Sequence, residues 1–270
     1  MHEHLLNRKG PRKPAETDPE VLQLLNQGEL ETVNLSEWLA VNQVQLIKHC
    51  FPAIGLEAVI PDCVASIAAL KKASAMNMIK AVGEQVFRYA AAEEKTEEVF
   101  EKLAHHLSDT VRCYACYLKG LDGQLRLQEK LDQSKKLIAD HHFGVREVVW
   151  MALRPVIDAE LDEAIQILSR WTSDPDENVR RFITESTRPR GVWCKHIDRL
   201  KETPGIALPL LHPLRHDPSV YVQNSLGNWL NDASKTQPEF VIDLCNQWQS
   251  EASKATLKII KRARRTIDKG

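Results

Sequence analysis

The sequence contains little glycine, 11 of its 270 residues, and no apolar run that approaches the roughly 18 residues needed to span a membrane. Its first twenty residues are polar and include a Lys/Pro-rich segment, whereas a secretion signal would be apolar. A Gly-rich phosphate loop, an H-E-x-x-H helix and a G-x-S-x-G turn are all missing, so kinases, metalloproteases and serine-type hydrolases have little support. We expect a folded, soluble, cytoplasmic protein that uses no cofactor and no metal.

Net charge is also nearly absent, because 36 Lys and Arg stand against 37 Asp and Glu. That balance alone gives no reason to expect nucleic acid. The charge is uneven, however: residues 171–270 contain 16 basic and 12 acidic side chains, which leaves 20 basic and 25 acidic ones in residues 1–170. The end of the chain has no acid between positions 252 and 267 and carries Lys254, Lys258, Lys261, Arg262, Arg264 and Arg265. This stripe suggests a polyanion held by its phosphates, or alternatively a soluble cap on the fold.

Apolar residues recur at intervals of three and four, and strict two-residue alternation is almost absent. This periodicity predicts an all-α fold. Three Asp-Pro pairs predict helix starts, since Asp accepts from the first free amides and Pro fits the first helical position: Asp18-Pro19, Asp174-Pro175 and Asp217-Pro218. Residues 1–17 mix basic residues with prolines and predict a flexible basic arm, followed by one helical domain over residues 18–270.

A valine followed by a basic or polar residue recurs about five residues into four of the expected helices. The intervals are 34, 34 and 43 residues between Val111-Arg112, Val145-Arg146, Val179-Arg180 and Val222-Gln223. Self-similarity at this period indicates stacked helical repeats. The arrangement resembles the second helix of a HEAT repeat and predicts HEAT-like repeats stacked into a curved superhelix with a concave binding groove. The longest interval holds the extra segment 188–193, and such an insertion commonly carries function.

Residues three or four apart share one face of a helix, so the repeats can be compared in register. The shared face carries Arg181, Glu185 and Arg188 in one helix, and other members of the same column are Tyr117, Glu147, Met151, Arg154, Asn224, Asn228 and Asn231, with Trp150 beside it. Stacked helices would turn this column into a polar and aromatic wall of the groove. The alternative is a solvated face whose ion pairs each contribute only about 0.2–0.5 kcal/mol. Three asparagines fit that alternative less well, because Asn is a poor helix former.

The six cysteines are too widely spaced to form the framework of a disulfide-stapled secreted domain. Cys113 and Cys116 form a C-x-x-C near two histidines, but no second C-x-x-C accompanies them. We interpret these thiols as reduced and packed inside a helix, and expect no metal site.

Two long motifs resemble those of a known family. They are R-R-F-I-T-E-S-T-R-P-R-G-V-W at residues 180–193 and D-P-S-V-Y-V-Q-N-S-L-G-N-W-L-N-D-A-S-K at residues 217–235. In this order they resemble the HEAT-repeat alkylpurine DNA glycosylases of the AlkC/AlkD superfamily, closer to the AlkC side, over about residues 140–265. The resemblance implies a monofunctional glycosylase that cradles duplex DNA and hydrolyses the N-glycosidic bond of cationic alkylpurines of the 3-methyladenine or 7-methylguanine type.

The residues present suit this chemistry. A cationic purine leaves without being protonated, so the enzyme must stabilise an oxocarbenium-like sugar and position a water, for which a carboxylate and aromatic faces are suitable. Glu185 matches the acid of the family motif, Trp193 matches its Trp, and Trp150 is the second aromatic candidate. The candidates for DNA contacts are Arg146, Arg180, Arg181, Arg188, Arg190, Lys195, Tyr221, Asn228, Asn231 and Lys235.

One position departs from the family pattern. Relatives on the AlkC side carry an acid just before the Phe of an F-x-V-R motif, and this chain has His142 there. The second catalytic carboxylate is therefore open between Asp140, which could instead be a helix cap, and Glu147 on the shared face. His142 itself could bind phosphate or orient water, and Asp232 is interpreted as a structural cap.

The missing acid motivates a second hypothesis, that the chain is a non-catalytic HEAT-repeat protein that binds DNA structure or serves as a scaffold for a protein partner. A groove lined by Arg, Asn and Trp suits phosphate and sugar better than a protein surface. We expect a monomer that binds double-stranded DNA with alkylated bases and no membrane.

Overall fold

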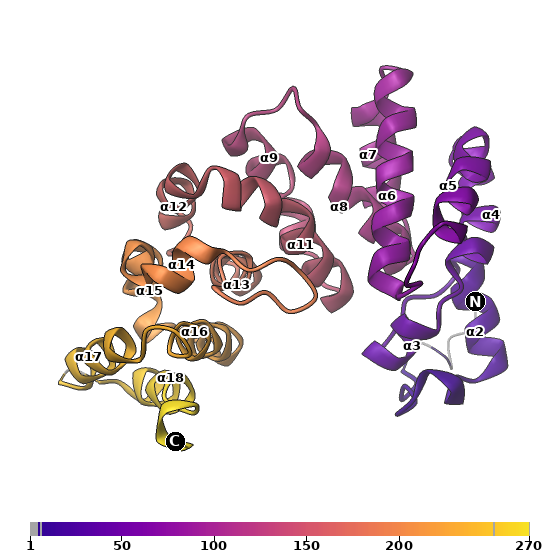
Figure 1. Ribbon diagram of the computed structural model, residues 1–270. Coiled ribbons are helices and arrows are strands. Elements are labelled where there is room, and N and C mark those ends of the chain that lie inside the picture. Colours follow the sequence, from indigo (N-terminus) through magenta and orange to yellow (C-terminus); the bar gives the residue numbers. More distant parts are fainter. Residues whose placement is uncertain (1–4, 6, 251, 270) are drawn as a thin grey trace. The chain divides into compact units, whose positions relative to one another are not determined.

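The computed structural model describes residues 5, 7–250 and 252–269. Within these residues the chain forms helices and no strand (Figure 1). This confirms the all-α fold class that the apolar periodicity predicts. None of the described helices is both long and apolar enough to cross a membrane.

The chain divides into two compact units, Met1–Leu125 with Asp140–Ala152, and Arg126–Ala139 with Leu153–Gly270. Helix α11 (Phe143–Ala159) begins in the first unit and ends in the second. The other helices of the first unit are η1 (Pro14–Glu16), α2 (Pro19–Gln27), α3 (Leu35–Ala40), α4 (Gln43–Ala53), η2 (Glu57–Val59), α5 (Ile60–Ala68), α6 (Ala75–Ala92), α7 (Thr96–Ala104) and α8 (Asp109–Leu121). Those of the second unit are α9 (Leu127–Gln133), α10 (Lys135–Ile138), α12 (Leu161–Ser169), α13 (Glu177–Ser186), α14 (Asp198–Glu202), η3 (Pro204–Ala207), α15 (Leu208–Leu211), η4 (Pro213–His216), α16 (Val220–Ala233), α17 (Pro238–Gln249), α18 (Lys254–Ala263) and η5 (Ile267–Lys269).

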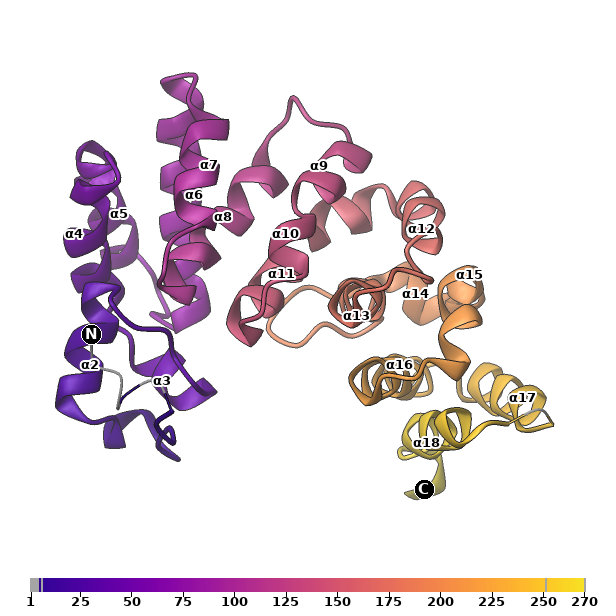
Figure 2. The same cartoon turned by 180° about the vertical axis from the view of Figure 1, so that it is seen from behind.

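Each unit has an apolar core made by neighbouring helices. In the first unit α6 packs against α5 and α8, and the rings of Phe51 and Tyr114 meet edge to face at 5.9 Å between centroids. In the second unit α13 packs against α16, and α16 packs against α18, as Figures 1 and 2 both show. The indole of Trp229 is fully buried at the centre of α16. Thr184 contacts Ser225 and Thr187 contacts Trp229, so α13 and α16 run in the same direction, as second helices of successive repeats do.

The valine repeat has one structural register. Each valine is the third residue of its helix, in α8, α11, α13 and α16, and not the fifth as the sequence suggested. All four side chains are buried: Val111, Val145, Val179 and Val222. The repeat therefore marks the same inward position of each second helix, as expected for HEAT-like repeats.

The polar residue after each valine bonds the chain just before its own helix. Arg112 donates from Nη1 to the carbonyl oxygens six and five residues earlier, at 3.0 and 2.8 Å. Arg180 repeats both bonds at 2.7 and 3.1 Å, and Arg146 does so at 2.6 and 2.8 Å. The amide of Gln223 reaches the corresponding two carbonyls at 2.8 and 3.4 Å. Because the carbonyls of these turns lack helical partners, the repeated side chain satisfies them.

Two of these three arginines also reach an aspartate of the next repeat. Arg112 binds both carboxylate oxygens of Asp140, at 2.8 and 3.1 Å, and Arg180 binds both of Asp217, at 2.6 and 3.1 Å. These bidentate pairs link consecutive repeats within a unit. We call them the Arg–Asp links.

The Asp-Pro pairs start a helix in one case of three. Asp18 accepts from the amides of Glu20 and Val21 and caps α2 as expected. The other two expectations are corrected, because α13 and α16 begin later and are capped by Asp176 and Ser219. Asp174 and Asp217 each accept from the amide two residues on and so close the turn that precedes the cap. Each carboxylate has further acceptor positions, and these bind a cation of another element: Lys135 binds Asp174, and Arg180 binds Asp217.

The expectation of a flexible arm is corrected for residues 7–17. The guanidinium of Arg8 donates to both oxygens of the Glu37 carboxylate, at 2.9 and 2.6 Å, and to the carbonyl of Glu31 at 2.6 Å. The side-chain amide of Asn34 donates to the carbonyl of Pro11 at 2.8 Å. These bonds hold the segment against α3. Residues 1–4 and 6 of the expected arm lie outside the described residues.

The C-x-x-C is an interior feature of α8. The side chains of Cys113 and Cys116 are fully buried, and burial raises the pKa of both thiols. No cluster of three or more potential metal ligands occurs among the described residues. The burial of both side chains within α8 confirms the interpretation of these cysteines as packed helix residues, and the expectation that the protein binds no metal stays a prediction.

Candidate nucleic-acid interface

Glu185 lies in the last turn of α13, with its side chain almost fully buried. Its Oε1 accepts from the hydroxyl of Ser225 on α16 at 2.7 Å and lies 3.4 Å from the guanidinium of Arg181. Its Oε2 lies 3.4 Å from Nη1 of Arg188. A carboxylate offers about four acceptor positions. Within the described residues three are occupied, so Oε2 retains one position for a further donor.

A second buried carboxylate shares Arg188 with Glu185. Asp232 of α16 accepts from Nε and Nη2 of Arg188 at 2.9 and 2.6 Å, and from Lys235 at 2.8 Å. Burial lowers the pKa of Arg188, but Glu185 and Asp232 outweigh it and hold that pKa above its ordinary value. We call Glu185 and Asp232 the carboxylate pair. The two acids are 47 positions apart in the sequence, and the packing of α13 against α16 brings them to one arginine.

The insertion at the repeat junction forms a loop, residues 187–197, that carries Trp193. The indole of Trp193 is 66% exposed, and its backbone is left-handed with φ of 62°. An exposed aromatic residue in this conformation is uncommon and costs about 1 kcal/mol or more, so the surrounding loop must enforce it. Beside it Val192 is also exposed. We call this segment the aromatic loop.

Arg154, near the end of α11, holds both ends of the aromatic loop. Its buried guanidinium donates to the carbonyl of Ser186 at 2.8 Å, to that of Arg188 at 2.5 Å and to that of Lys195 at 2.9 Å. Burial lowers the pKa of this arginine below its usual range. The loop is closed further by the amide of Ile197, which donates to the carbonyl of Pro189 at 3.2 Å. The exposed tip is therefore mounted on a fixed base.

The remaining candidate cations of the second unit differ in their surroundings. Arg181 stacks over the ring of Tyr221 at 4.2 Å from the centroid, which joins α13 to α16 on the same side as Glu185. Arg190 donates to the carbonyl of Asp232 at 3.3 Å, and the ammonium of Lys195 is largely exposed. Arg180 lies at the other end of α13, where it forms an Arg–Asp link. Arg181, Arg188, Arg190, Tyr221 and Lys235 are thus gathered around the carboxylate pair, and Arg180 is not.

The asparagines of α16 contact the segment around α18. The carbonyl oxygen of the Asn228 side chain accepts from Arg262 at 3.4 Å. That of buried Asn231 accepts from the amide and hydroxyl of Thr266, at 3.1 and 3.0 Å. Both asparagines therefore help to hold α18 against α16. This role explains why Asn occupies two positions of a helix, although Asn is a poor helix former. Their expected contact with DNA stays a prediction.

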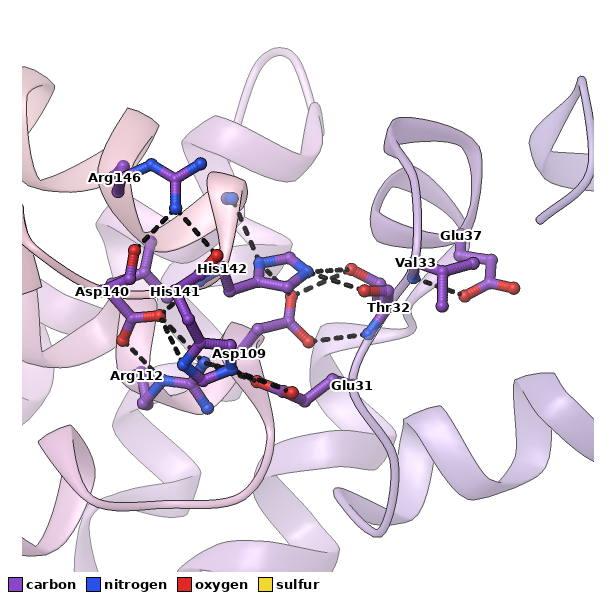
Figure 3. A network of polar contacts seen from close by, with 12 residues as sticks. Glu31, Thr32, Val33, Glu37, Asp109, Arg112, Asp140, His141, His142 and Arg146 are labelled. Atoms are coloured by element: carbon purple, nitrogen blue, oxygen red, sulfur yellow. Dashed lines mark hydrogen bonds and ion pairs between the residues drawn. The ribbon is translucent and has the colours of Figure 1, made fainter. Parts of the chain in front are cut away.

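His142 occupies the position just before α11 and is buried. Its Nδ1 accepts from the amide of Gly144 at 3.1 Å, and its Nε2 donates to the carbonyl of Thr32 at 2.7 Å (Figure 3). The ring thus acts as the N-cap of α11, as Asp176 and Ser219 do in later repeats. With both nitrogens used inside the protein, we assign His142 a structural role, in contrast to the expected contact with phosphate or water.

The neighbours of His142 form a buried network in the first unit (Figure 3). The amide and hydroxyl of Thr32 donate to the two oxygens of Asp109 at 3.0 Å each. Burial raises the pKa of Asp109, against the lowering effect of nearby His142 and Thr32. Asp140 accepts from Arg112 and from the amide of His142 at 2.7 Å, which makes it part of an Arg–Asp link and of the turn before α11. The N-cap of α11 is His142, so the expectation that Asp140 caps this helix is corrected: Asp140 closes the turn before the cap, as Asp174 and Asp217 do.

Two further candidates form a local pair on α11. The indole of Trp150 donates from Nε1 to Oε2 of Glu147 at 3.0 Å, and the Trp150 side chain is buried. Arg146, one residue before Glu147, bonds the carbonyls of Asp140 and His141. All three side chains belong to the first unit. Their proposed part in catalysis or DNA contact stays a prediction.

Sequence reasoning missed one supporting residue, Ser225, and did not predict the roles of two others, Arg154 and Asp232. No sequence pattern indicated Ser225. Its hydroxyl becomes a partner of Glu185 only when α16 packs against α13. Arg154 was placed on the shared face, but its three carbonyl partners could not be read from spacing. Asp232 was interpreted as a cap, although it pairs with Arg188 44 positions away.

The fold and the repeat define an all-α protein of HEAT-like repeats, and solved structures share that architecture. One is AlkC of Pseudomonas fluorescens, an alkylpurine DNA glycosylase bound to DNA with an abasic-site analogue. It has a TM-score of 0.67 and 20% identity, over 97% of this chain and 66% of that chain. AlkD2 of Streptococcus mutans has a TM-score of 0.60 and 23% identity, over 78% of this chain and 98% of that one. The protein smu.31 of Streptococcus mutans UA159 has a TM-score of 0.54 and 22% identity, over 82% and 98%.

These structures confirm the resemblance to AlkC and AlkD that the two motifs carry, and at 20–23% identity they show a shared fold. Among curated proteins, the uncharacterized protein YhaZ of Bacillus subtilis is 40% identical over 165 residues, which cover 58% of this chain and 45% of YhaZ. The chain therefore spans less than half the length of that relative and 66% of the AlkC chain. No protein-family model matches the sequence.

Proposed function

We propose that the protein is a monofunctional DNA glycosylase that binds duplex DNA and releases cationic alkylpurines of the 3-methyladenine or 7-methylguanine type. The observation that carries the proposal is the position of Glu185, buried between Arg181 and Arg188 with one acceptor position of Oε2 unoccupied among the described residues. The AlkC structure to which the chain is similar is an alkylpurine glycosylase bound to DNA, which supports the same class of ligand here.

The proposed reaction needs a fixed negative charge more than an acid. The alkylated purine is already cationic, so it departs with the electrons of the N-glycosidic bond and becomes neutral. The sugar left behind gains positive charge at C1′, a water oxygen bonds to C1′, and the water's proton passes to solvent. A buried carboxylate held by three donors is preorganised to stabilise that charge, and the acceptor position of Oε2 that no described residue fills would take a hydrogen bond from the water.

The aromatic loop supplies the second requirement. Trp193 is exposed on a loop fixed by Arg154, so its face is available to a sugar or base without large rearrangement. A π-face beside a developing cation is attractive by about 0.5–2 kcal/mol. Arg190 and Lys195, in the same loop, are suited to phosphate contacts next to that point. No cofactor or metal enters the proposed reaction, and the protein is proposed to act as a monomer.

The test compares base release from methylated duplex DNA by the wild type and by Glu185→Gln. We expect Glu185→Gln to slow single-turnover release by about 10²-fold or more, because it removes charge from a preorganised site while keeping the shape and the Ser225 bond. Its affinity for undamaged duplex should change little. Glu163→Gln, at an exposed position of α12, is the matched control. Equal release by Glu185→Gln and the wild type would contradict the assignment of Glu185.

One observation favours a second candidate, a non-catalytic DNA-binding protein of the same fold. The position where relatives on the AlkC side carry an acid is filled by His142, whose ring is buried as a helix cap. If Glu185 does not suffice for catalysis without this second acid, the chain would bind alkylated and undamaged duplex alike and release no base. The same release measurement separates the two functions.

A further inference from the structure

A cavity of about 630 Å³ is present where α18 packs against α16 in the second unit. Five cations and one acid border it: Lys258, Lys261, Arg262, Arg265, Lys269 and Asp268. Val220, whose side chain is 54% exposed, and the amide of Asn224 complete the lining. We call it the α16/α18 cavity. It is separate from the carboxylate pair, none of whose members lines it.

Most of these cations have no partner inside the protein. The side chains of Lys258, Lys261 and Arg265 form no hydrogen bond or ion pair with any residue that the structure describes. The acid of the cavity, Asp268, is bonded to Arg264 at 3.2 Å. An excess of uncompensated positive charge at a concave surface raises the local concentration of anions.

Three of the cations, Lys258, Lys261 and Arg262, lie on α18, whose position against α16 is fixed. Gly227 of α16 allows the stem of Arg262 to lie directly on the backbone, since a Cβ at Gly227 would come within 2.8 Å of the Arg262 Cβ. Asn228 accepts from the Arg262 guanidinium, and buried Asn231 accepts twice from Thr266 just beyond α18. The opposite face of α18 is buried through Ile259 and Ala263. The charged face is therefore presented at low conformational cost.

The spacing of the cations fits a nucleic-acid strand. Lys258 and Lys261 lie in α18, and Arg265 lies two residues beyond its end, in the turn that follows. All three line the cavity, and seven residues at the helical rise span about 10 Å. One strand of duplex DNA carries a charge every 3.4 Å or so of axis, so this length faces about three phosphates. A small free anion would occupy only a fraction of such a row. The apolar surface of Val220 suits the sugar between phosphates.

We propose that the α16/α18 cavity is a second DNA-binding site, which holds the phosphodiester backbone of a DNA strand through Lys258, Lys261 and Arg265 and does not depend on damage. The inference rests on the DNA-binding part of the proposed function and is independent of base excision. The site anchors the second unit on DNA away from the lesion and adds non-specific affinity.

The test measures binding of an undamaged duplex of about 20 base pairs to the full-length protein over a range of salt concentrations. The variant K258Q/K261Q/R265Q removes three charges, and K48Q/K71Q/K72Q removes three exposed charges of the first unit as the matched control. We expect the first variant to bind about tenfold or more weakly at 50 mM salt, with the slope of log Kd against log salt reduced by about 2 to 3. The control and the charge-keeping variant K258R/K261R/R265K should bind as the wild type does.

The proposal is overturned if the first variant keeps the affinity and salt slope of the wild type, or if the control triple loses as much. It is equally overturned if deoxyadenosine monophosphate binds the wild type at micromolar concentration and the first variant loses that binding while its duplex affinity is unchanged, because the site would then serve a free nucleotide. Base release by the wild type at saturating concentration, measured separately, reports on the glycosylase proposal. A failure of either proposal is thus distinguishable from a failure of the other.

Discussion

Arg188 is the residue on which the candidate site depends. Its guanidinium joins Glu185 at the end of α13 to Asp232 on α16, and the two acids hold its pKa above the ordinary value despite burial. The sequence motif predicted Arg188 as a phosphate contact. In the structure it is first of all the counter-ion of two buried carboxylates, so its removal would not report on DNA alone.

We predict that Arg188→Met lowers the free energy of unfolding by about 3–5 kcal/mol, because it leaves two buried carboxylates without their shared cation. Arg190→Met should cost less than about 1 kcal/mol, since Arg190 makes one bond of 3.3 Å to a backbone carbonyl. Urea unfolding of both variants measures the difference. Equal stability of the two variants would contradict the role assigned to Arg188.

His106 gives the protein a pH-dependent contribution to stability. Its Nδ1 accepts from the amide of Ser108 at 3.0 Å, a bond that a protonated ring cannot make. Burial, and then the charge of Arg112, lower the pKa of His106 below its ordinary value of 6.5. As pH falls the unfolded chain therefore takes up this proton first, and the contribution of His106 is complete above about pH 6.5 and lost below it.

We predict that His106→Asn flattens the fall in stability between pH 7 and pH 5, because Asn keeps an acceptor for the Ser108 amide and does not titrate. The measurement is the urea midpoint of the variant and the wild type at several pH values. His49→Asn, at an exposed position of α4, is the control and should keep the wild-type slope. A wild-type slope in His106→Asn would show that this histidine is not the titrating group.

At the scale of the helices, the spacing of Val-Arg predicted the repeats but not the task of the arginine. Periodicity identifies positions that share a face, and the buried valines confirm that part. The bonds of Arg112 and Arg180 to carbonyls and to an aspartate of the next repeat depend on the turn before each helix, whose geometry no pattern of apolar residues specifies. For the same reason the face of Asn228 and Asn231 was expected to line a groove, whereas both bond the segment around α18.

The Arg180–Asp217 link lends itself to a double-mutant cycle. Asp217 is buried, so Arg180→Met should cost about 3 kcal/mol or more by leaving an unpaired buried carboxylate. The double variant Arg180→Met with Asp217→Asn should be more stable than Arg180→Met, because the uncompensated charge is gone. Unfolding free energies of the four proteins give a coupling of about 1–3 kcal/mol if the link exists. Additive effects of the two substitutions would contradict the link.

At the scale of the whole molecule, the near-zero net charge conceals a basic carboxyl-terminal part and an acidic amino-terminal part. Which cations of the basic part are available could not be predicted, because availability depends on ion pairs that form only on folding. Arg180 and Arg188 are used within the protein, whereas Lys195, Lys258 and Lys261 are exposed. Charge counts thus indicated the kind of partner, and only the contacts indicate the candidate surfaces.

We predict that the pair Arg190→Ala and Lys195→Ala weakens duplex binding to a similar extent for every sequence, with the salt slope reduced by about 2. These two cations lie in the aromatic loop and make few contacts with the rest of the fold, so the free energy of unfolding should be retained. Fluorescence anisotropy with two unrelated duplexes at several salt concentrations measures both quantities. An unchanged slope would place the DNA backbone elsewhere.

Base release from alkylated duplex DNA decides most directly whether the carboxylate pair and the aromatic loop form a glycosylase. The measurement is the amount of 3-methyladenine and 7-methylguanine freed from a methylated duplex by protein in excess, compared with the spontaneous rate in the same buffer. We predict release well above the spontaneous rate that falls about 10²-fold or more in Glu185→Gln. Release at the spontaneous rate from DNA that is fully bound would contradict the proposed activity and leave a DNA-binding protein of the same fold.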